Sequence, residues 1–221
     1  MSNDKLISLM MFLFNGPSDA ELTILLAHGA GAPMDSASLT SIAETLGAAG
    51  LRIARFEFGY MAARRASAAK RPPPHANALT AEYIAALDML DASGPLVIGG
   101  KSMGGRVASM VADQLYASQR ISGLLCLGYP FHPIGKPVQL RTAHLAGMRT
   151  PALIVQGTRD QFGTREEVAS YDLSKSIEIL WLADGDHDLR PRKAISGFTV
   201  ADHMRTMADH VTAWSKALIG R

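Results

Sequence analysis

The sequence has little of what marks secreted or nucleic-acid-binding proteins. It contains one cysteine, Cys126, in 221 residues, so no disulfide can form within the chain, which fits a reducing compartment. Because Cys126 stands in the apolar run 123–128, we interpret it as a small buried side chain rather than a catalytic thiol. The formal net charge is only +2, which is too small by itself to indicate a nucleic-acid partner.

Apolar runs long enough to cross a membrane are also missing. The largely apolar run 6–14 follows Lys5 and loosely imitates a signal peptide, but it ends in Asn-Gly-Pro at residues 15–17 without a small-residue cleavage site. It is too short to span a bilayer. We therefore interpret it as a strand or hairpin arm, and we expect a cytoplasmic protein with no membrane partner.

Repeats, low-complexity segments and interdomain linkers are absent as well. A hydrophobic fraction of 48% and a charged fraction of 19% describe a globular chain that can bury a substantial core. A length of 221 residues fits one domain of ordinary size. We predict a single domain over residues 1–221, and the oligomeric state is not indicated by any pattern.

Strand-like and helix-like segments alternate along the chain. Strands are expected at residues 22–27, 51–58, 95–99, 121–127, 152–157 and 177–182. Helices are expected at residues 38–49 and, from their apolar spacing, near 83–90, 107–115 and 200–218. This alternation predicts an α/β fold with a mostly parallel central sheet and helices on both faces.

Two segments interrupt or limit this pattern. Residues 59–76 contain Arg64, Arg65, Lys70 and Arg71 and end near three consecutive prolines, and we interpret them as a basic loop. Only about twenty residues separate the strands at 121–127 and 152–157. That distance leaves no room for a large helical lid, so we expect none.

A serine stands in a glycine-rich turn between a predicted strand and a predicted helix. Residues 99–105 read Gly-Gly-Lys-Ser-Met-Gly-Gly and contain the G-x-S-x-G pattern of a nucleophile elbow. The turn must be so tight that β-carbons at positions 100 and 104 would collide with backbone. A phosphate-binding loop would need glycine where Pro95 stands. We predict that Ser102 is a nucleophile; the simpler alternative is a serine that only caps the next helix.

A serine hydroxyl needs a base, and the base needs an acid to orient it. Among the seven histidines, His187 follows the predicted strand 177–182, and Asp160 follows the predicted strand 152–157. Both lie just past the carboxyl end of a strand, where active sites of open α/β sheets gather. We predict His187 as the base and Asp160 as the acid.

Three further aspartates flank His187 and leave alternatives open. Asp184, Asp186 or Asp188 could replace Asp160 as the orienting acid, or could bind a metal together with His187. Neighbouring acids on a short loop rarely converge on one ion or reach the base from behind. We therefore expect no metal and no other cofactor.

Backbone donors for an oxyanion are expected at two places. One is the N–H of Met103, directly after the serine, and the other lies in the segment 28–32, which follows the first central strand. Ala30 N–H is our choice, with Gly31 close behind. The side chain of His28 is expected to support this loop rather than to take part in the chemistry.

The substrate pocket is expected beside these groups. Tyr60 and Arg64 follow a strand that ends near the site, and Tyr129 and His132 approach it from the other side. Together with Gly31 they are the candidate pocket residues. The basic loop could favour anionic substrates, although a solvated surface loop is the commoner explanation.

These patterns agree in order and spacing with a known family. The motifs are residues 28–31, 56–58, 70–74, 100–106 and 185–189. Over essentially its full length the chain resembles the α/β-hydrolase superfamily. More narrowly, it resembles small lidless bacterial hydrolases that are similar to the hydrolase-like domain of a eukaryotic non-specific-lethal complex subunit and lie near dienelactone-hydrolase-type proteins. The resemblance implies a triad of Ser102, Asp160 and His187, but no particular substrate.

We therefore expect a serine hydrolase that cleaves an ester or thioester of a small or soluble molecule through an acyl-enzyme. Two rivals keep the same fold. The first is a catalytically silent hydrolase-fold interaction module. The second is an acyltransferase or perhydrolase, which would use the same triad and differ only in the acyl acceptor.

Overall fold

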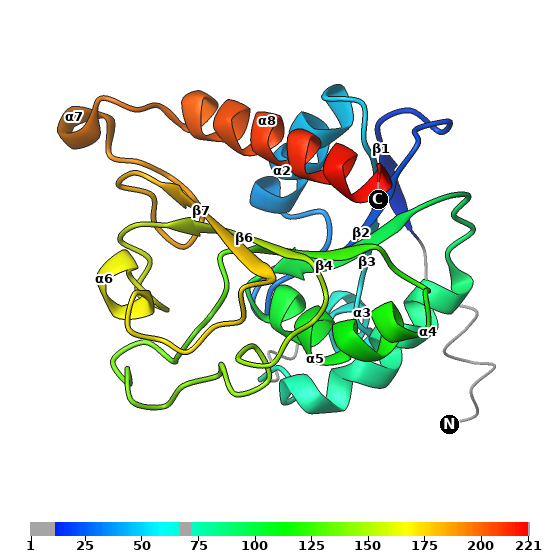
Figure 1. The fold of residues 1–221 in the computed structure, drawn as a ribbon, viewed down its shortest axis with the longest axis horizontal. Coiled ribbons are helices and arrows are strands. Elements are labelled where there is room, and N and C mark those ends of the chain that lie inside the picture. The colour runs from blue at the N-terminus through cyan, green and yellow to red at the C-terminus, as the bar shows by residue number, and fades with distance from the viewer. Residues whose placement is uncertain (1–11, 67–71, 221) are drawn as a thin grey trace.

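A computed structural model describes residues 12–66 and 72–220 (Figure 1). Its strands are β1 (Leu13–Asn15), β2 (Thr23–Ala27), β3 (Arg52–Phe56), β4 (Leu96–Lys101), β5 (Gly123–Leu127), β6 (Ala152–Gly157) and β7 (Ile177–Leu182). Its helices are α2 (Ala37–Ala48), α3 (Gly59–Ala66), the 3-10 helix η1 (Ala76–Leu79), α4 (Thr80–Met89), α5 (Met103–Ala117), α6 (Arg165–Val168), α7 (Lys193–Ser196) and α8 (Val200–Ile219).

The described strands form one seven-stranded sheet in the order β1-β3-β2-β4-β5-β6-β7. The edge strand β1 is antiparallel to β3, and every other neighbouring pair is parallel. Figure 1 shows α2 and α8 on one side of the sheet and α4 and α5 on the other. The predicted fold class is therefore confirmed. Residues 128–151 contain no helix or strand, which confirms that no large lid lies between β5 and β6.

The core consists of two layers separated by the sheet. Successive residues of a strand point to opposite faces, and in β4 Val97 packs in one layer while Ile98 packs in the other. β2, β4, β5 and β6 are buried along their whole length, as expected of parallel strands covered on both faces. Cys126 is buried within β5, which confirms its interpretation as a core residue.

The alternating pattern of β3 includes a buried arginine. Arg55 is only 4% exposed because β1 and the segment before α2 surround it. Its guanidinium donates to Met34 O at 2.8 Å, to Thr40 Oγ1 at 2.7 Å and to Asn15 Oδ1 at 2.9 Å. These bonds offset the cost of burying the charge, and they connect the edge strand to the segment that leads into α2.

The expectation of a loop over residues 59–76 is wrong for its first half. Residues Gly59–Ala66 form α3, which begins where Met61 N–H and Ala62 N–H donate to Phe58 O. Alanine and arginine favour helix, and the side chain of Met61 is buried. Lys70 and Arg71 lie outside the described residues. Most of the run 6–14 lies outside them as well, but its last two residues belong to β1 (Leu13–Asn15). The single-domain expectation stays a prediction.

Candidate active site

Ser102 occupies the turn between β4 and α5 in a strained backbone conformation. Its φ is 52° and its ψ is −117°, a combination that non-glycine residues rarely adopt. The turn is held on both sides, because Ser102 N–H donates to Leu127 O at 2.9 Å and Arg106 N–H donates to Ser102 O at 3.1 Å. The backbone is therefore strained at the residue that the sequence indicates as the nucleophile, and such strain is typical of nucleophile elbows.

The tight turn also explains its glycines. A Cβ at Gly104 would lie 2.5 Å from Ala27 O and 2.6 Å from His28 O, and a Cβ at Gly100 would lie 2.6 Å from Ala27 O. These oxygens belong to the backbone at the end of β2 and cannot rotate away. The collisions predicted for positions 100 and 104 are present.

We expect Gly104→Ala to lower the free energy of unfolding by about 2–3 kcal/mol, because overpacking against backbone outweighs the better helix propensity of alanine. Urea unfolding followed by circular dichroism measures this. Gly147→Ala is the matched control, since a Cβ at Gly147 meets nothing within 4 Å. Equal midpoints for the two variants would contradict the steric explanation.

The three predicted triad residues lie together at the carboxyl ends of β4, β6 and β7. His187 Nε2 is 2.8 Å from Ser102 Oγ, and His187 Nδ1 is 2.8 Å from Asp160 Oδ2. A carboxylate can only accept a hydrogen bond, so Nδ1 carries the proton and donates to Asp160. Nε2 is then left to accept the hydroxyl proton of Ser102.

Asp160 is fully buried and accepts two hydrogen bonds besides that of His187. Phe162 N–H donates to Oδ1 at 2.9 Å, and Gln156 Nε2 donates to Oδ2 at 2.9 Å. The amide of Gln156 has a defined orientation, because its Oε1 accepts from Tyr129 N–H at 2.7 Å. Sequence reasoning missed Gln156, although a polar residue inside the otherwise apolar strand β6 was a signal for it.

The other aspartates near His187 have different partners. Asp184 pairs with Arg192, Asp188 with Lys101, and Asp186 Oδ1 accepts the N–H of Asp188 at 2.9 Å. None of these carboxylates contacts the imidazole among the hydrogen bonds of the described residues. The arrangement therefore favours Asp160 as the orienting acid and does not converge on a metal.

His28 supports the loop after β2 in the way the sequence suggested. Its Nε2 accepts from Phe58 N–H at 3.1 Å, so Nδ1 carries the proton and donates to Gly29 O at 2.7 Å. In a trans peptide the carbonyl and the next N–H point in opposite directions. With Gly29 O held inward by His28, Ala30 N–H points away from it, and it has no acceptor within the described part of the chain.

The peptide after Ala30 is held from α3. The Tyr60 hydroxyl donates to Ala30 O at 3.1 Å, and Arg64 lies over the Tyr60 ring, 5.5 Å from its centroid. Met103 is the first residue of α5, where the N–H has no partner inside the helix. Ala30 and Met103 thus present the two backbone donors that an oxyanion requires, which makes them candidates for that role.

Burial lowers the pKa of His28 from its ordinary value near 6.5. His28 therefore binds a proton more readily in the unfolded chain than in the folded chain. The contribution of neutral His28 to the free energy of unfolding is present above pH ~6.5 and declines as the pH falls below it. We expect the wild type to exceed His28→Gln in free energy of unfolding by about 1–2 kcal/mol at pH 7.5. The difference should narrow at pH 5.5. Chemical denaturation at both pH values tests this, and an unchanged difference would contradict it.

Two cavities meet at His187. One of about 330 Å³ is lined by residues 29–32 and by Lys101, Ser102 and Phe162, and a second of about 210 Å³ lies beyond Phe162 and reaches Ile134. The Phe162 ring centroid lies 4.3 Å from that of His187. Gly31 lines the larger cavity as expected, whereas Phe162 was not anticipated.

Two of the expected pocket residues are in the interior. Tyr129 is fully buried and its hydroxyl donates to Arg141 O at 3.0 Å. His132 is 2% exposed and bonds Pro133 O. Neither lines the cavities at His187, so the expectation is wrong for both. The physical reason is that the chain turns inward after Gly128, where φ is +65°, and packs its aromatic side chains in the core.

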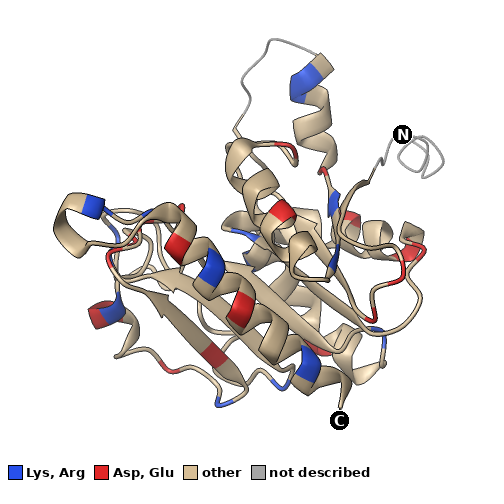
Figure 2. Ribbon diagram, turned by 90° about the horizontal axis from the view of Figure 1, so that it is seen from above, with Lys and Arg blue, Asp and Glu red and all other residues tan. Residues whose placement is uncertain are grey.

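The described part of the basic segment carries little free positive charge. Arg65, at the end of α3, forms hydrogen-bonded ion pairs with Asp35 and Glu57, and Arg64 reaches Ala30 O at 3.5 Å. Figure 2 shows this basic end of α3 projecting from the body of the protein, while charges of both signs alternate along α8. These contacts do not favour anionic substrates over neutral ones.

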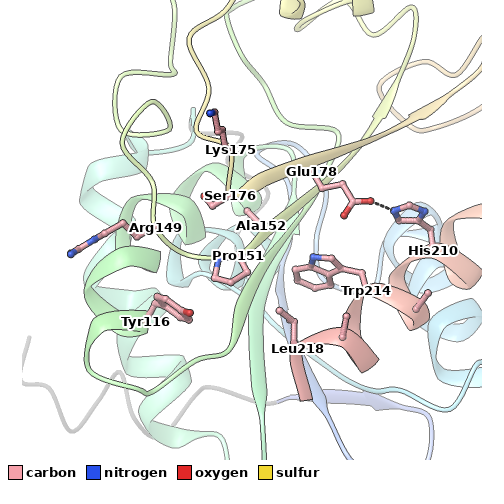
Figure 3. A pocket seen from close by; sticks show the side chains of 12 residues that line it. Tyr116, Arg149, Pro151, Ala152, Lys175, Ser176, Glu178, His210, Trp214 and Leu218 are labelled. Atoms are coloured by element: carbon pink, nitrogen blue, oxygen red, sulfur yellow. Dashed lines mark hydrogen bonds and ion pairs between the residues drawn. The ribbon is translucent and has the colours of Figure 1, made fainter. Parts of the chain in front are cut away.

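Another cavity lies away from the triad. It has a volume of about 510 Å³, and its lining includes Trp214 and Ala152, the first residue of β6 (Figure 3). It contains both a serine and a histidine, but Ser176 Oγ donates to Met148 O at 2.8 Å and His210 pairs with Glu178. The two are not bonded to each other, so this cavity lacks a hydrogen-bonded serine–histidine pair like that of Ser102 and His187.

Known protein families and solved structures show the same fold as this chain. A family described as "Alpha/beta hydrolase domain" matches residues 20–216, and the chain belongs to this family. Est1E from Butyrivibrio proteoclasticus, in a structure with ferulic acid bound, has a TM-score of 0.68 at 15% identity over 96% of each chain. A dienelactone hydrolase from Anabaena variabilis has a TM-score of 0.67 at 18% identity, covering 93% of this chain and 90% of its own.

A third similar structure is a serine hydrolase without a lid from Xanthomonas campestris, with a TM-score of 0.64 at 14% identity over 96% of this chain and 90% of its own. The family match confirms the predicted superfamily, and these likenesses show the same fold. The likeness to the non-specific-lethal complex subunit stays a prediction. No helix among the described residues is long and apolar enough to cross a membrane.

Proposed function

We propose that the protein is a serine hydrolase that cleaves an ester or thioester bond through an acyl-enzyme. The observation that carries this proposal is the continuous hydrogen-bonded chain from Ser102 Oγ through the His187 imidazole to Asp160, with both links at 2.8 Å. A serine that only capped α5 would need no such partners, and the Ser102 side chain makes no cap hydrogen bond. Conversion of a weak nucleophile into a strong one requires this arrangement.

The reaction follows from the geometry. His187 Nε2 removes the hydroxyl proton as Ser102 Oγ attacks the carbonyl carbon, and the N–H groups of Met103 and Ala30 stabilise the oxyanion. The protonated imidazole then donates its proton to the leaving oxygen or sulfur as that bond breaks. Water then attacks the acyl carbon while His187 Nε2 takes its proton, and His187 returns that proton to Ser102 Oγ as the acyl–Oγ bond breaks and the acid product leaves. Asp160 orients the imidazole and stabilises its positive charge in both steps.

The substrate is proposed to be small or soluble. Of the cavities beside His187, that of about 330 Å³ lies at the low end of the range for small-molecule sites and that of about 210 Å³ lies below it. Residues 128–151 provide no helical lid. We further propose a cytoplasmic location.

A fluorophosphonate probe tests the proposal directly, because it labels only an activated serine. We expect labelling of the wild type and of Ser176→Ala, which removes the serine of the remote cavity, and no labelling of Ser102→Ala. A p-nitrophenyl ester series from acetate to dodecanoate should give highest kcat/KM for the short acyl chains. An unlabelled wild type would favour a silent interaction module, and product analysis with competing alcohols or peroxide would reveal an acyltransferase or perhydrolase.

A further inference from the structure

Lys101 stands immediately before Ser102 in the chain, and its side chain crosses to the loop that carries the base. Its Nζ donates to the backbone oxygen of His187 at 2.7 Å and lies 3.1 Å from Asp188 Oδ1. Lys101, the residue before Ser102, therefore contacts both His187 and Asp188, the residue after it. We propose that Lys101 and Asp188 form a latch that positions His187 against Ser102 and balances the charge beside it, an inference that rests on the proposed function.

The burial of Lys101 indicates that its contact with His187 and Asp188 is not an ordinary surface ion pair. Its side chain is only 9% exposed, and it extends from a strand whose residues are all buried. Removing an ammonium group from water is costly unless it is paired and hydrogen-bonded. Asp188 provides that pairing: although partial burial opposes its ionisation, the Lys101 ammonium holds the pKa of this carboxyl below its usual value.

Contacts within the loop determine its shape but not its position relative to the elbow. Asp186 Oδ1 accepts the N–H groups of Asp188 and Arg190, both at 2.9 Å. The Lys101 contacts and the triad hydrogen bond are the polar contacts that join residues 184–190 to the turn at Ser102 within the described chain. The latch thus acts through His187 and makes Lys101 a positioning residue.

The charges around the imidazole define the electrostatic effect of the latch. Lys101 and Asp188 face it from β4 and from its own loop, and Asp160 faces it from the segment after β6. Asp186 directly precedes His187 and Arg190 lies further along the loop, while Arg159, after β6, borders the same cavity and pairs with Asp186. With the latch intact, the positive and negative charges of the pair largely cancel at His187. Removing one partner leaves the other uncompensated in a partly buried site, where such charges act strongly.

Two single variants and their combination test the latch through the pH profile of kcat/KM on p-nitrophenyl acetate. Lys101→Met should lower kcat between about 10- and 100-fold with little change in KM, because misplacing a catalytic group by about 1 Å costs this much. The unpaired Asp188 carboxylate then favours the imidazolium, so the acid limb of the profile moves to higher pH. In Asp188→Asn the unpaired ammonium moves the acid limb to lower pH, with a smaller loss of kcat because the bond to His187 O remains.

The double variant separates position from charge. Its acid limb should return close to that of the wild type, while kcat stays low. Lys175→Met, the same substitution at an exposed lysine of the remote cavity, is the matched control and should leave both quantities unchanged. A Lys101→Met protein with wild-type kcat, or acid limbs that move in the same direction in both single variants, would overturn the proposal.

Hydrogen exchange separates failure of the latch from failure of the proposed function. The amides of residues 186–189 should exchange faster in Lys101→Met than in the wild type, while those of β6 remain unchanged. This measurement does not require activity, so it tests the latch even if the wild type is not labelled by fluorophosphonate. Unchanged exchange at residues 186–189 would overturn the latch, whatever the outcome of labelling.

Discussion

Ser102→Ala should lower kcat by about 10⁴-fold or more on a short p-nitrophenyl ester, with the folded structure retained. The reason is that no other hydroxyl bonds His187 in the part of the chain that the structure describes: the His187 Nε2 that bonds Ser102 Oγ at 2.8 Å would face a methyl group. Residual turnover would come from water activated by His187 in the same cavity. Steady-state kinetics with a purified variant, corrected for spontaneous hydrolysis, measure the loss.

A companion variant distinguishes loss of chemistry from loss of fold. Because φ at Ser102 is 52°, Ser102→Gly relieves backbone strain that Ser102→Ala retains. We expect both variants to be inactive, and the glycine variant to be the more stable by about 1 kcal/mol in chemical unfolding, since relief of strain of about 1–3 kcal/mol exceeds the entropic cost of glycine. Substantial activity in either variant would reject Ser102 as the nucleophile.

Asp160→Asn should reduce kcat about as severely, by about 10⁴-fold, the size of effect seen when the acid of a serine-protease triad becomes an amide. Phe162 N–H donates to Oδ1 of Asp160, so the asparagine oxygen will occupy that position. Its NH₂ group then faces His187 Nδ1 and the Gln156 amide. His187 must accept at Nδ1 and carry its proton on Nε2, where it can no longer remove the proton of Ser102.

The effect of the Asp160→Asn substitution is measured by kcat and by the rate of fluorophosphonate labelling, both of which should fall. Asp186→Asn is the matched control, because its side-chain oxygen can still accept the two loop N–H groups that it now binds. We expect that control to retain most of its activity. If Asp160→Asn kept wild-type kcat, the orienting acid would have to be sought among the other aspartates of the His187 loop.

Much of the fold could be predicted because its signals are local. β6 and β7 have the bounds predicted from the sequence, since both segments are mainly apolar and each is followed by a turn. The elbow has a local signal in its glycine spacing, although the backbone oxygens that require glycine at 100 and 104 include those of Ala27 and His28 at the end of β2. The chain order of serine, acid and base then placed His187 and Asp160 without knowledge of any distance.

The errors and omissions involve contacts between distant parts of the chain. Tyr129 and His132 follow a strand that ends near the site, but strand order alone does not say whether the next residues turn outward or, as here, into the core. Gln156 is polar in an apolar strand, and only the folded chain shows which carboxylate it meets. The helix α3 lies where a composition rich in arginine suggested a loop, because a single buried contact of Met61 decides its packing.

The sequence by itself determined most of the strands and helices, and it indicated Ser102, Asp160 and His187 as the candidate nucleophile, acid and base, because these inferences depend on local periodicity, on the glycine spacing of the turn and on order along the chain. Tertiary structure alone decided how those residues are held: the 2.8 Å links of the triad, the orientation of the Ala30 peptide by His28, and the bridge from Lys101 to His187 and Asp188. These depend on which side chains meet across the carboxyl edge of the sheet. These contacts join segments up to 86 positions apart in the sequence, and no local pattern of residues predicts them.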